Sequence, residues 1–357
     1  MDRVLKRQNT EHRIQNTEYR MRETAGIGSD GIARPPKIYL DTNHLINIAN
    51  VRKGKKLPPG QSEDDYRSID DCIKSYCGLI FNPYAALEWV EGNATKESAS
   101  GIAAVIDSAR VKYMIDADYL VYAQEILALC RRQNPDISVP DLPPVLQDIS
   151  GDSTFRSALG ILVRTVPDFL ERNKLEQIQR KGELPITVPT FSAGDWARET
   201  FDWRENNREI YQERVDGFIS SLSEDITRKD EYFRDRDRYR GDWIRRIAKI
   251  DKVLKAFNPQ CDVDAILQKI DVEECPAITL YWTVREKRMR SGLPPNDNDV
   301  DDYMYIPVIP YADIILLERQ LRGFVLQADR SLESKVFSNM GDALIAIEDQ
   351  EFMWGCS

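Results

Sequence analysis

The sequence is poor in the residues that build soft metal sites and histidine-based catalysis. Its 357 residues include only two histidines, His12 and His44, and six cysteines without a CxxC pair. A zinc site needs clustered Cys and His ligands, so this scatter argues against zinc. A Ser-His-Asp or Cys-His mechanism would depend on His44 as the only credible base, which disfavours that chemistry as well.

Other absences narrow the class of protein further. No stretch approaches the roughly 18 consecutive apolar residues of a membrane span. Residues 1–34 are polar, mix Arg with Glu and lack the apolar core of a secretion signal, so we expect a polar arm on a cytoplasmic protein. A Gly-rich phosphate loop of the Walker type is also missing, which disfavours nucleotide hydrolysis by that route.

An excess of positive charge is also missing, because 59 Asp and Glu residues outnumber 49 Lys and Arg residues and give a formal net charge of -10. Such a balance argues against a protein that coats nucleic acid through its overall field. It suits a site that concentrates carboxylates around a hard divalent cation.

The chain contains a short stretch, residues 37–43, that reads as a buried strand running into a helix. Ile38, Tyr39 and Leu40 are apolar and β-prone, and helical spacing resumes at His44. This switch predicts Asp41 at the carboxyl end of a sheet strand, where open α/β sheets hold their ligands. We expect Thr42 and Asn43 to serve the helix N-terminus, with Asn43 as a cap or a support of the site.

Strand and helix patterns alternate at both ends of the chain, which predicts an α/β fold with a parallel sheet flanked by helices. Strands are expected at residues 37–40, 78–81, 311–318 and 335–338, and helices at 62–76, after Asn82-Pro83, and at 102–132, 303–310, 319–328 and 341–349. The sheet domain would be discontinuous, formed by residues 35–115 and 293–357. Residues 116–292, with mostly helical patterns, would be a large all-α insertion.

The insertion contains the main stretch in which basic and aromatic residues are interleaved. Such a stretch can follow a phosphate backbone and stack bases, and a solvated helix laced by ion pairs is the alternative. The residues predicted to bind nucleic acid, here and at the end of the following helix, are Arg234, Arg238, Arg245, Arg246, Arg288 and Arg290.

Acidic residues occur at three kinds of position. Asp41, Asp313 and Glu318 lie at the ends of apolar predicted strands, Glu88 lies within an apolar predicted helix, and Asp299 and Asp302 belong to the densest acidic segment of the chain. Carboxylates that converge at one sheet edge need a counter-charge, and oxygen-only ligands suit Mg²⁺ or Mn²⁺. The chemistry that follows is phosphoryl transfer, with phosphodiester hydrolysis the best fit. For Glu88 alone, an ordinary surface glutamate is the alternative.

These motifs resemble those of the PIN-like domain nucleases. The resemblance lies in Asp41-Thr42-Asn43, in a helical Glu88 and in Asp299-x-x-Asp302 followed by Ile-Pro-Tyr-Ala-Asp313. It covers about residues 37–110 and 296–350. Where the family usually has Thr-Asp, this chain has Leu317-Glu318, and an alternative register would take Asp313 and Asp329 as the third and fourth acids.

The resemblance implies a PIN-like sheet domain and a metal-dependent endoribonuclease. Asp41, Asp302, Asp313 and Glu318 would hold Mg²⁺ or Mn²⁺, Glu88 would ligate through water or orient the attacking water, and Asn43 and Asp299 would support the site. Single-stranded RNA is the expected substrate, and a protein inhibitor or a second copy is a possible partner. A toxin of a toxin-antitoxin pair, an antiviral defence effector and an RNA-processing enzyme all fit. The rivals are a single-strand or flap DNA nuclease of the same fold and a non-catalytic binding module.

Overall fold

The fold is that of a computed structural model. It describes residues 35–82, 96–115, 118–133, 145–148, 208–236, 238–239, 255, 260, 262–268, 271–296 and 298–354.

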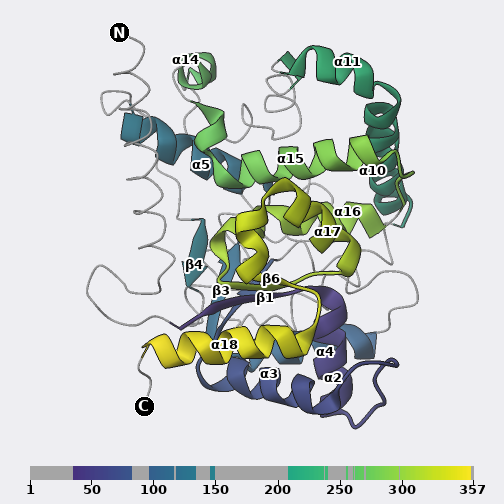
Figure 1. The fold of residues 1–357 in the computed structure, drawn as a ribbon, viewed down its shortest axis with the longest axis vertical. Helices are drawn as coiled ribbons and strands as arrows, with labels where there is room; N and C mark the ends of the chain where they lie inside the picture. Colours follow the sequence, from purple (N-terminus) through teal and green to yellow (C-terminus); the bar gives the residue numbers. More distant parts are fainter. Residues whose placement is uncertain are drawn as a thin grey trace, which may run out of the picture.

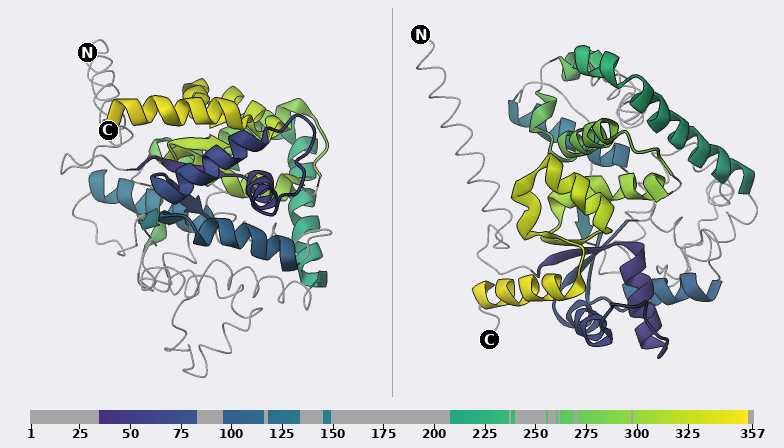
Figure 2. Two further views of the ribbon diagram at one scale, coloured as in Figure 1. Left: turned by 90° about the horizontal axis from the view of Figure 1, so that it is seen from below. Right: turned by 45° about the vertical axis from the view of Figure 1, so that its right-hand side comes forward.

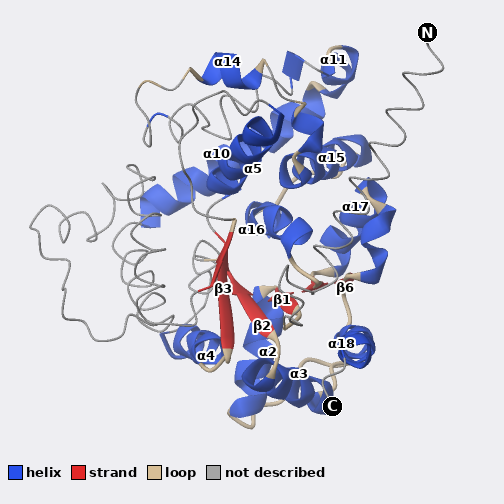
Figure 3. Cartoon of the chain, turned by 90° about the vertical axis from the view of Figure 1, so that its left-hand side faces the viewer, coloured by secondary structure: helices blue, strands red, loops and turns tan. Residues whose placement is uncertain are grey.

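The centre of the molecule is a six-stranded sheet with the order β4-β3-β2-β1-β5-β6. Five strands run parallel and β4 pairs antiparallel with β3 at one edge. Figure 3 shows the strands in the middle of the molecule with helices on either side. The strands are β1 (Lys37–Leu40), β2 (Gly78–Phe81), β3 (Val111–Ile115), β4 (Leu146–Asp148), β5 (Ile314–Leu316) and β6 (Val336–Phe337). The predicted parallel sheet flanked by helices is therefore confirmed.

Helices cover both faces of the sheet (Figure 1). One layer consists of α2 (Thr42–Arg52), α3 (Glu63–Ser75), α4 (Lys96–Asp107) and α18 (Met340–Trp354). The other consists of α5 (Asp118–Gln133), α15 (Pro276–Ser291), α16 (Asn298–Tyr305), the 3₁₀ helix η3 (Ile306–Tyr311) and α17 (Arg319–Ala328). The helices α10 (Arg208–Thr227), α11 (Lys229–Arg234) and α14 (Val263–Leu267) lie farther from the sheet (Figures 1 and 2). Two further 3₁₀ helices are η2 (Val272–Glu274) and η4 (Arg330–Ser334).

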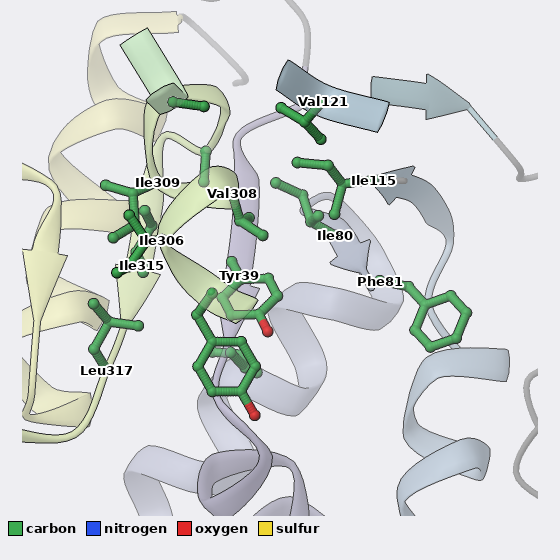
Figure 4. Packing of buried hydrophobic residues seen from close by; sticks show 14 of the residues in the cluster. Tyr39, Ile80, Phe81, Ile115, Val121, Ile306, Val308, Ile309, Ile315 and Leu317 are labelled. Atoms are coloured by element: carbon green, nitrogen blue, oxygen red, sulfur yellow. The ribbon is translucent and has the colours of Figure 1, made fainter. Parts of the chain in front are cut away.

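The core lies on both faces of the sheet, and one part of it is packed between the sheet and the layer that contains η3. Tyr39 and Ile315 are register partners on neighbouring strands. Figure 4 shows them on the same side of the sheet as Ile80, facing Val308 of η3. All of these side chains are at most 3% exposed. Continuous apolar strands of this kind are expected for a parallel sheet covered on both faces.

Several residues that favour the start or end of a helix are found at helix ends in the structure. Ser62 caps α3 by accepting a hydrogen bond from the amide of Asp65, as expected for a serine at that position. Gly292 ends α15 in the left-handed conformation, with a φ of 65°, which favours glycine. The predicted helix at residues 319–328 matches α17.

The prediction of one helix at 102–132 is wrong. The segment is divided between α4 and α5, with β3 between them. The Val-Lys-Tyr-Met-Ile segment pairs with β2 instead of continuing the helix, because the exposed edge of β2 offers it a ladder of hydrogen bonds.

The boundary of the helical insertion is wrong as well. Helices α5 and α15 contribute Val121, Ile126, Ile278 and Trp282 to the same hydrophobic core as the sheet, and β4 belongs to the sheet itself. With one apolar residue in three, β4 has too weak a pattern to be recognised as a strand, and its pairing with β3 determines it. In the described parts of the chain, no helix is both long and apolar enough to cross a bilayer.

Candidate metal-binding site at the carboxyl edge of the sheet

Two strand-to-helix turns lie side by side where β1 and β5 end. Asp41 follows β1 and is the N-cap residue of α2, and Glu318 comes after β5 and is the N-cap residue of α17. The amide of Asp41 donates to the carbonyl of Leu316 at 3.1 Å, so the pairing of the two strands continues into the turns. Both helix N-termini therefore open at the same edge of the sheet, where their partial positive charge favours carboxylates.

Asp41 is the most buried acid of this edge, with 2% of its surface exposed. Its Oδ1 accepts a hydrogen bond from the amide of Asn43 at 2.8 Å. The helix cap is thus Asp41 itself, and the prediction that Asn43 caps the helix is wrong. Burial, followed by repulsion from Glu318, raises the pKa of Asp41 from 3.8 to about 7, although backbone hydrogen bonds from Asn43 and Glu318 act against the rise.

Asn43 connects the two turns through its side chain. Its Nδ2 donates to Oε1 of the exposed Glu318 at 2.6 Å. This bond holds the carboxylate of Glu318 over the start of α2, next to Asp41. Asn43 therefore supports the candidate site, as the sequence predicts, but by positioning Glu318.

The third carboxylate comes from α16, which packs over this edge from the other layer. Burial, then repulsion from Glu318, Asp41 and Asp299, raises the pKa of Asp302 from 3.8 to about 8, and Arg288 acts in the opposite direction. Asp41, Asp302 and Glu318 therefore form one electrostatic group, although they are far apart in the sequence.

Asp299 lies one helical turn before Asp302 and is 5% exposed. Its Oδ2 accepts from Nη2 of Arg288 at 2.6 Å and from the amide of Asn296 at 2.7 Å. One oxygen of the carboxylate is therefore engaged by these two donors, which gives Asp299 a supporting position.

The donors at this edge have the chemistry that a hard divalent cation requires. Carboxylate and amide oxygens suit Mg²⁺ or Mn²⁺. The pKa values of Asp41 and Asp302 are raised first by burial and then by repulsion from neighbouring acids, and a cation would offset both effects. Within the described residues, no three His, Cys, Asp or Glu side chains are grouped tightly enough to hold a metal ion as they stand. The electrostatic group is thus looser than a closed ligand set, and Glu88, the other predicted acid of the site, lies outside the described residues.

Asp313 is not part of this group, so its assignment as a metal ligand is wrong. The strand is shorter than predicted, and Asp313 precedes it at the amino edge of the sheet. Its amide donates to the carbonyl of Lys37 at 2.8 Å, and its Oδ2 accepts from the amide of Lys37 at 2.8 Å. Four residues of β1, about 13 Å at the usual rise, separate that level from Asp41. Because β1 and β5 are parallel, an acid before β5 and an acid after β1 lie at opposite edges.

The predicted basic residues have different environments. Arg288 is 2% exposed and bonded to Asp299, so its assignment to a nucleic-acid surface is wrong. Arg234, Arg238 and Arg290 are exposed. The guanidinium carbon of Arg290 lies 3.9 Å from the centre of the Phe233 ring, which joins the end of α15 to α11. Arg245 and Arg246 lie outside the described residues.

Two polar residues near this edge were not assigned to the site from the sequence. Asn82 follows β2, the strand next to β1, and is 4% exposed, so it places a further polar residue at the carboxyl edge. Its position after a buried strand is the same signal that identified Asp41. His44, in contrast, contacts the hydroxyl of Tyr66 at 2.8 Å through Nδ1, and burial lowers its pKa to about 4, which makes it a neutral residue of the core.

No family model, no curated protein and no solved structure matches this chain, and the case for a function therefore rests on the chemistry of this edge.

Proposed function

We propose that the chain is a divalent-metal-dependent nuclease of the PIN-like kind that hydrolyses phosphodiester bonds of RNA. The observation that supports this proposal best is the convergence of Asp41, Asp302 and Glu318 from three segments, with the pKa of the two aspartates raised to about 7 and 8. Burial and mutual repulsion both raise these pKa values, and carboxyl groups perturbed in this way at the carboxyl edge of a parallel sheet are candidates for an active site.

In this proposal the residues of the chain bind the cation and orient the attacking water. Asp41, at the end of β1, and Asp302, on α16, would hold the cation, and Glu318, fixed by Asn43, would complete the ligand set or orient the attacking water. A bound Mg²⁺ or Mn²⁺ would supply the charge that offsets the phosphate and lowers the pKa of water. The two helix N-termini at this edge favour a phosphate group nearby.

Exposed cationic and aromatic residues support a nucleic-acid substrate. Arg234 and Arg238 are exposed, and Arg290 is both exposed and stacked on Phe233. Such combinations contact the backbone and bases of single strands. The preference for RNA over DNA rests on the family resemblance alone.

The test compares cleavage of single-stranded RNA and single-stranded DNA with Mg²⁺, with Mn²⁺ and with excess EDTA. We expect RNA cleavage that requires the metal and is lost in Asp41→Asn and Asp302→Asn. The matched control is Asp313→Asn, which removes a buried carboxyl at the opposite edge and should retain cleavage.

Each contrary result has a specific meaning. Cleavage of DNA alone would identify a DNA nuclease. Cleavage that survives EDTA, or full activity in Asp41→Asn, would reject the metal-dependent mechanism. Binding of RNA without cleavage would identify a binding module. If RNA is cleaved, growth arrest by the wild type but not by Asp41→Asn would favour a toxin or phage-defence role over RNA processing.

A further inference from the structure

Helix α15 carries two buried arginines one turn apart, and their surroundings differ. Arg285 and Arg288 are each 2% exposed, and each pairs with an aspartate of another helix. Arg285 points toward α10, where Asp225 is its partner, and Arg288 points toward α16, where Asp299 is its partner. The pair of arginines allows a comparison within one helix.

Arg285 has the environment of an arginine that serves the fold. Its three guanidinium nitrogens all have partners, namely the carboxylate of Asp225, the hydroxyl of Tyr281 and the hydroxyl of Ser221. Such a residue fixes α10 against α15 and leaves no guanidinium nitrogen without a partner.

Arg288 has fewer hydrogen-bond partners than Arg285. Its Nη2 donates to Asp299 and to the carbonyl of Pro294 at 3.1 Å, whereas Nε and Nη1 are buried and have no partner in the part of the chain that the structure describes. One face of the guanidinium lies 5.5 Å from the centre of the Phe324 ring. A buried charge with idle donors is a poor way to gain stability, since an apolar side chain of similar size would often serve better.

The bonds that Arg288 does make fix the segment leading to Asp302. Pro294 belongs to the loop after α15, and Asp299 lies in the first turn of α16 and also accepts from the amide of Asn296. Loop and helix start are thus tied to α15 through one guanidinium. Asp302 follows Asp299 by one turn, so its place at the carboxyl edge depends on this tie.

We propose that Arg288, acting through Asp299, is a positioning residue that sets the carboxylate of Asp302 toward Asp41 and Glu318 for cation binding. This inference rests on the proposed function, because it concerns the geometry of the same site. Arg288 is too buried to contact a substrate. Its role in this proposal is to orient a metal ligand.

The test is the affinity of the metal-free protein for Mn²⁺, measured by titration calorimetry or by the paramagnetic resonance of free Mn²⁺, at a temperature where every variant is folded. We expect Arg288→Met and Asp299→Asn each to weaken Mn²⁺ binding by about tenfold or more, the usual effect of losing a residue that orients a ligand. The double variant should be no weaker than the worse single variant, because both substitutions break the same tie.

A purely electrostatic role predicts a different pattern. Arg288→Met alone leaves an extra negative charge near the site and would tighten Mn²⁺ binding, whereas Asp299→Asn leaves an extra positive charge and would weaken it. Positioning predicts weakening in both. Arg288→Lys is a further check if Arg288→Met does not fold, since lysine keeps the charge but cannot present the same planar fork to two acceptors. Affinity equal to that of the wild type in Arg288→Lys would overturn the positioning role.

Arg285→Met is the matched control on the same helix. It should lower the melting temperature and leave Mn²⁺ affinity within about twofold, because its partner lies on α10. Equal losses of affinity in Arg285→Met and Arg288→Met would show that any damage to α15 weakens the site and would overturn the assignment. Absence of Mn²⁺ binding in the wild type would reject the proposed function together with this inference. Wild-type binding that is unchanged in Arg288→Met would reject only the inference.

Discussion

Replacing Asp41 with asparagine should make the metal-free protein more stable while removing its activity. The side chain is 2% exposed, and burial together with repulsion from Glu318 raises its pKa from 3.8 to about 7. The folded state therefore holds the proton more tightly than the unfolded chain does. The contribution of Asp41 to stability is greatest at low pH and is lost as the pH rises from about 4 through about 7. Asparagine keeps the shape of the side chain and carries no charge, so Asp41→Asn should not lose this contribution to stability over this range of pH.

The size of the effect follows from the pKa. Each unit between the folded and unfolded values corresponds to about 1.4 kcal/mol, so a rise from 3.8 to about 7 makes ionisation of Asp41 cost the fold about 4 kcal/mol. The new amide NH₂ group needs an acceptor in a buried place, and an imperfect one costs about 1 to 3 kcal/mol. We expect a net gain of about 2 kcal/mol at pH 8, which falls to about zero or below at pH 4.5.

The assay is urea denaturation in EDTA at pH 4.5 and pH 8, for the wild type, Asp41→Asn and the exposed-site control Asp342→Asn. The midpoint of Asp41→Asn should rise relative to the wild type at pH 8 only, with an unchanged slope. The control, on the surface of α18, should follow the wild type at both values of pH. If Asp41→Asn is no more stable than the wild type at pH 8, ionisation of Asp41 does not cost the fold what its burial and the repulsion from Glu318 imply, and the argument for a cation there loses its basis.

Three further results are expected. Mn²⁺ at a hundred times its dissociation constant should add about 2.7 kcal/mol to the free energy of unfolding. That gain should shrink from pH 9 to pH 6, because protons compete for Asp302, whose pKa is about 8, and a titration of stability at several pH values measures it. Gly78→Ala should destabilise the protein by about 1 to 3 kcal/mol in urea denaturation, since a Cβ there would lie 2.5 Å from the tyrosine ring of β3. Gly323→Ala on α17 is the control: its Cβ meets nothing within 4 Å, and the variant should gain up to about 1 kcal/mol. Replacing Arg234 and Arg238 with alanine should lower the slope of log K against log salt for single-stranded RNA by about 0.7 per contact, as filter binding at several salt concentrations would show; an unchanged slope would mean that these arginines only face solvent.

Part of the architecture could be predicted because the signals are local. A run of apolar residues ending in Asp41, a serine cap at Ser62 and the glycine at Gly292 each determine the backbone of their own neighbourhood through sterics and hydrogen bonds within a few residues. From such signals the alternation of strands and helices follows, and with it the parallel sheet and the edge at which Asp41 lies.

Asp313 shows a limit that the sequence itself could have revealed. The acids on either side of β5, Asp313 and Glu318, look equivalent as residues at the ends of an apolar run. Once β1 and β5 are taken as parallel, only the acid after β5 can reach the edge of Asp41. The error came from treating both ends of a strand as one place.

The sequence by itself determined that a carboxylate follows the first strand and that further acids follow in the last third of the chain. Only the tertiary structure decided which of them meet, because strand order, register and helix docking depend on contacts between residues hundreds of positions apart. The same holds for Arg288, whose local sequence is that of an ordinary charged helix end. Its burial follows from the packing of α17 on α15 and from the contact with Asp299 at the start of α16, which no local pattern encodes.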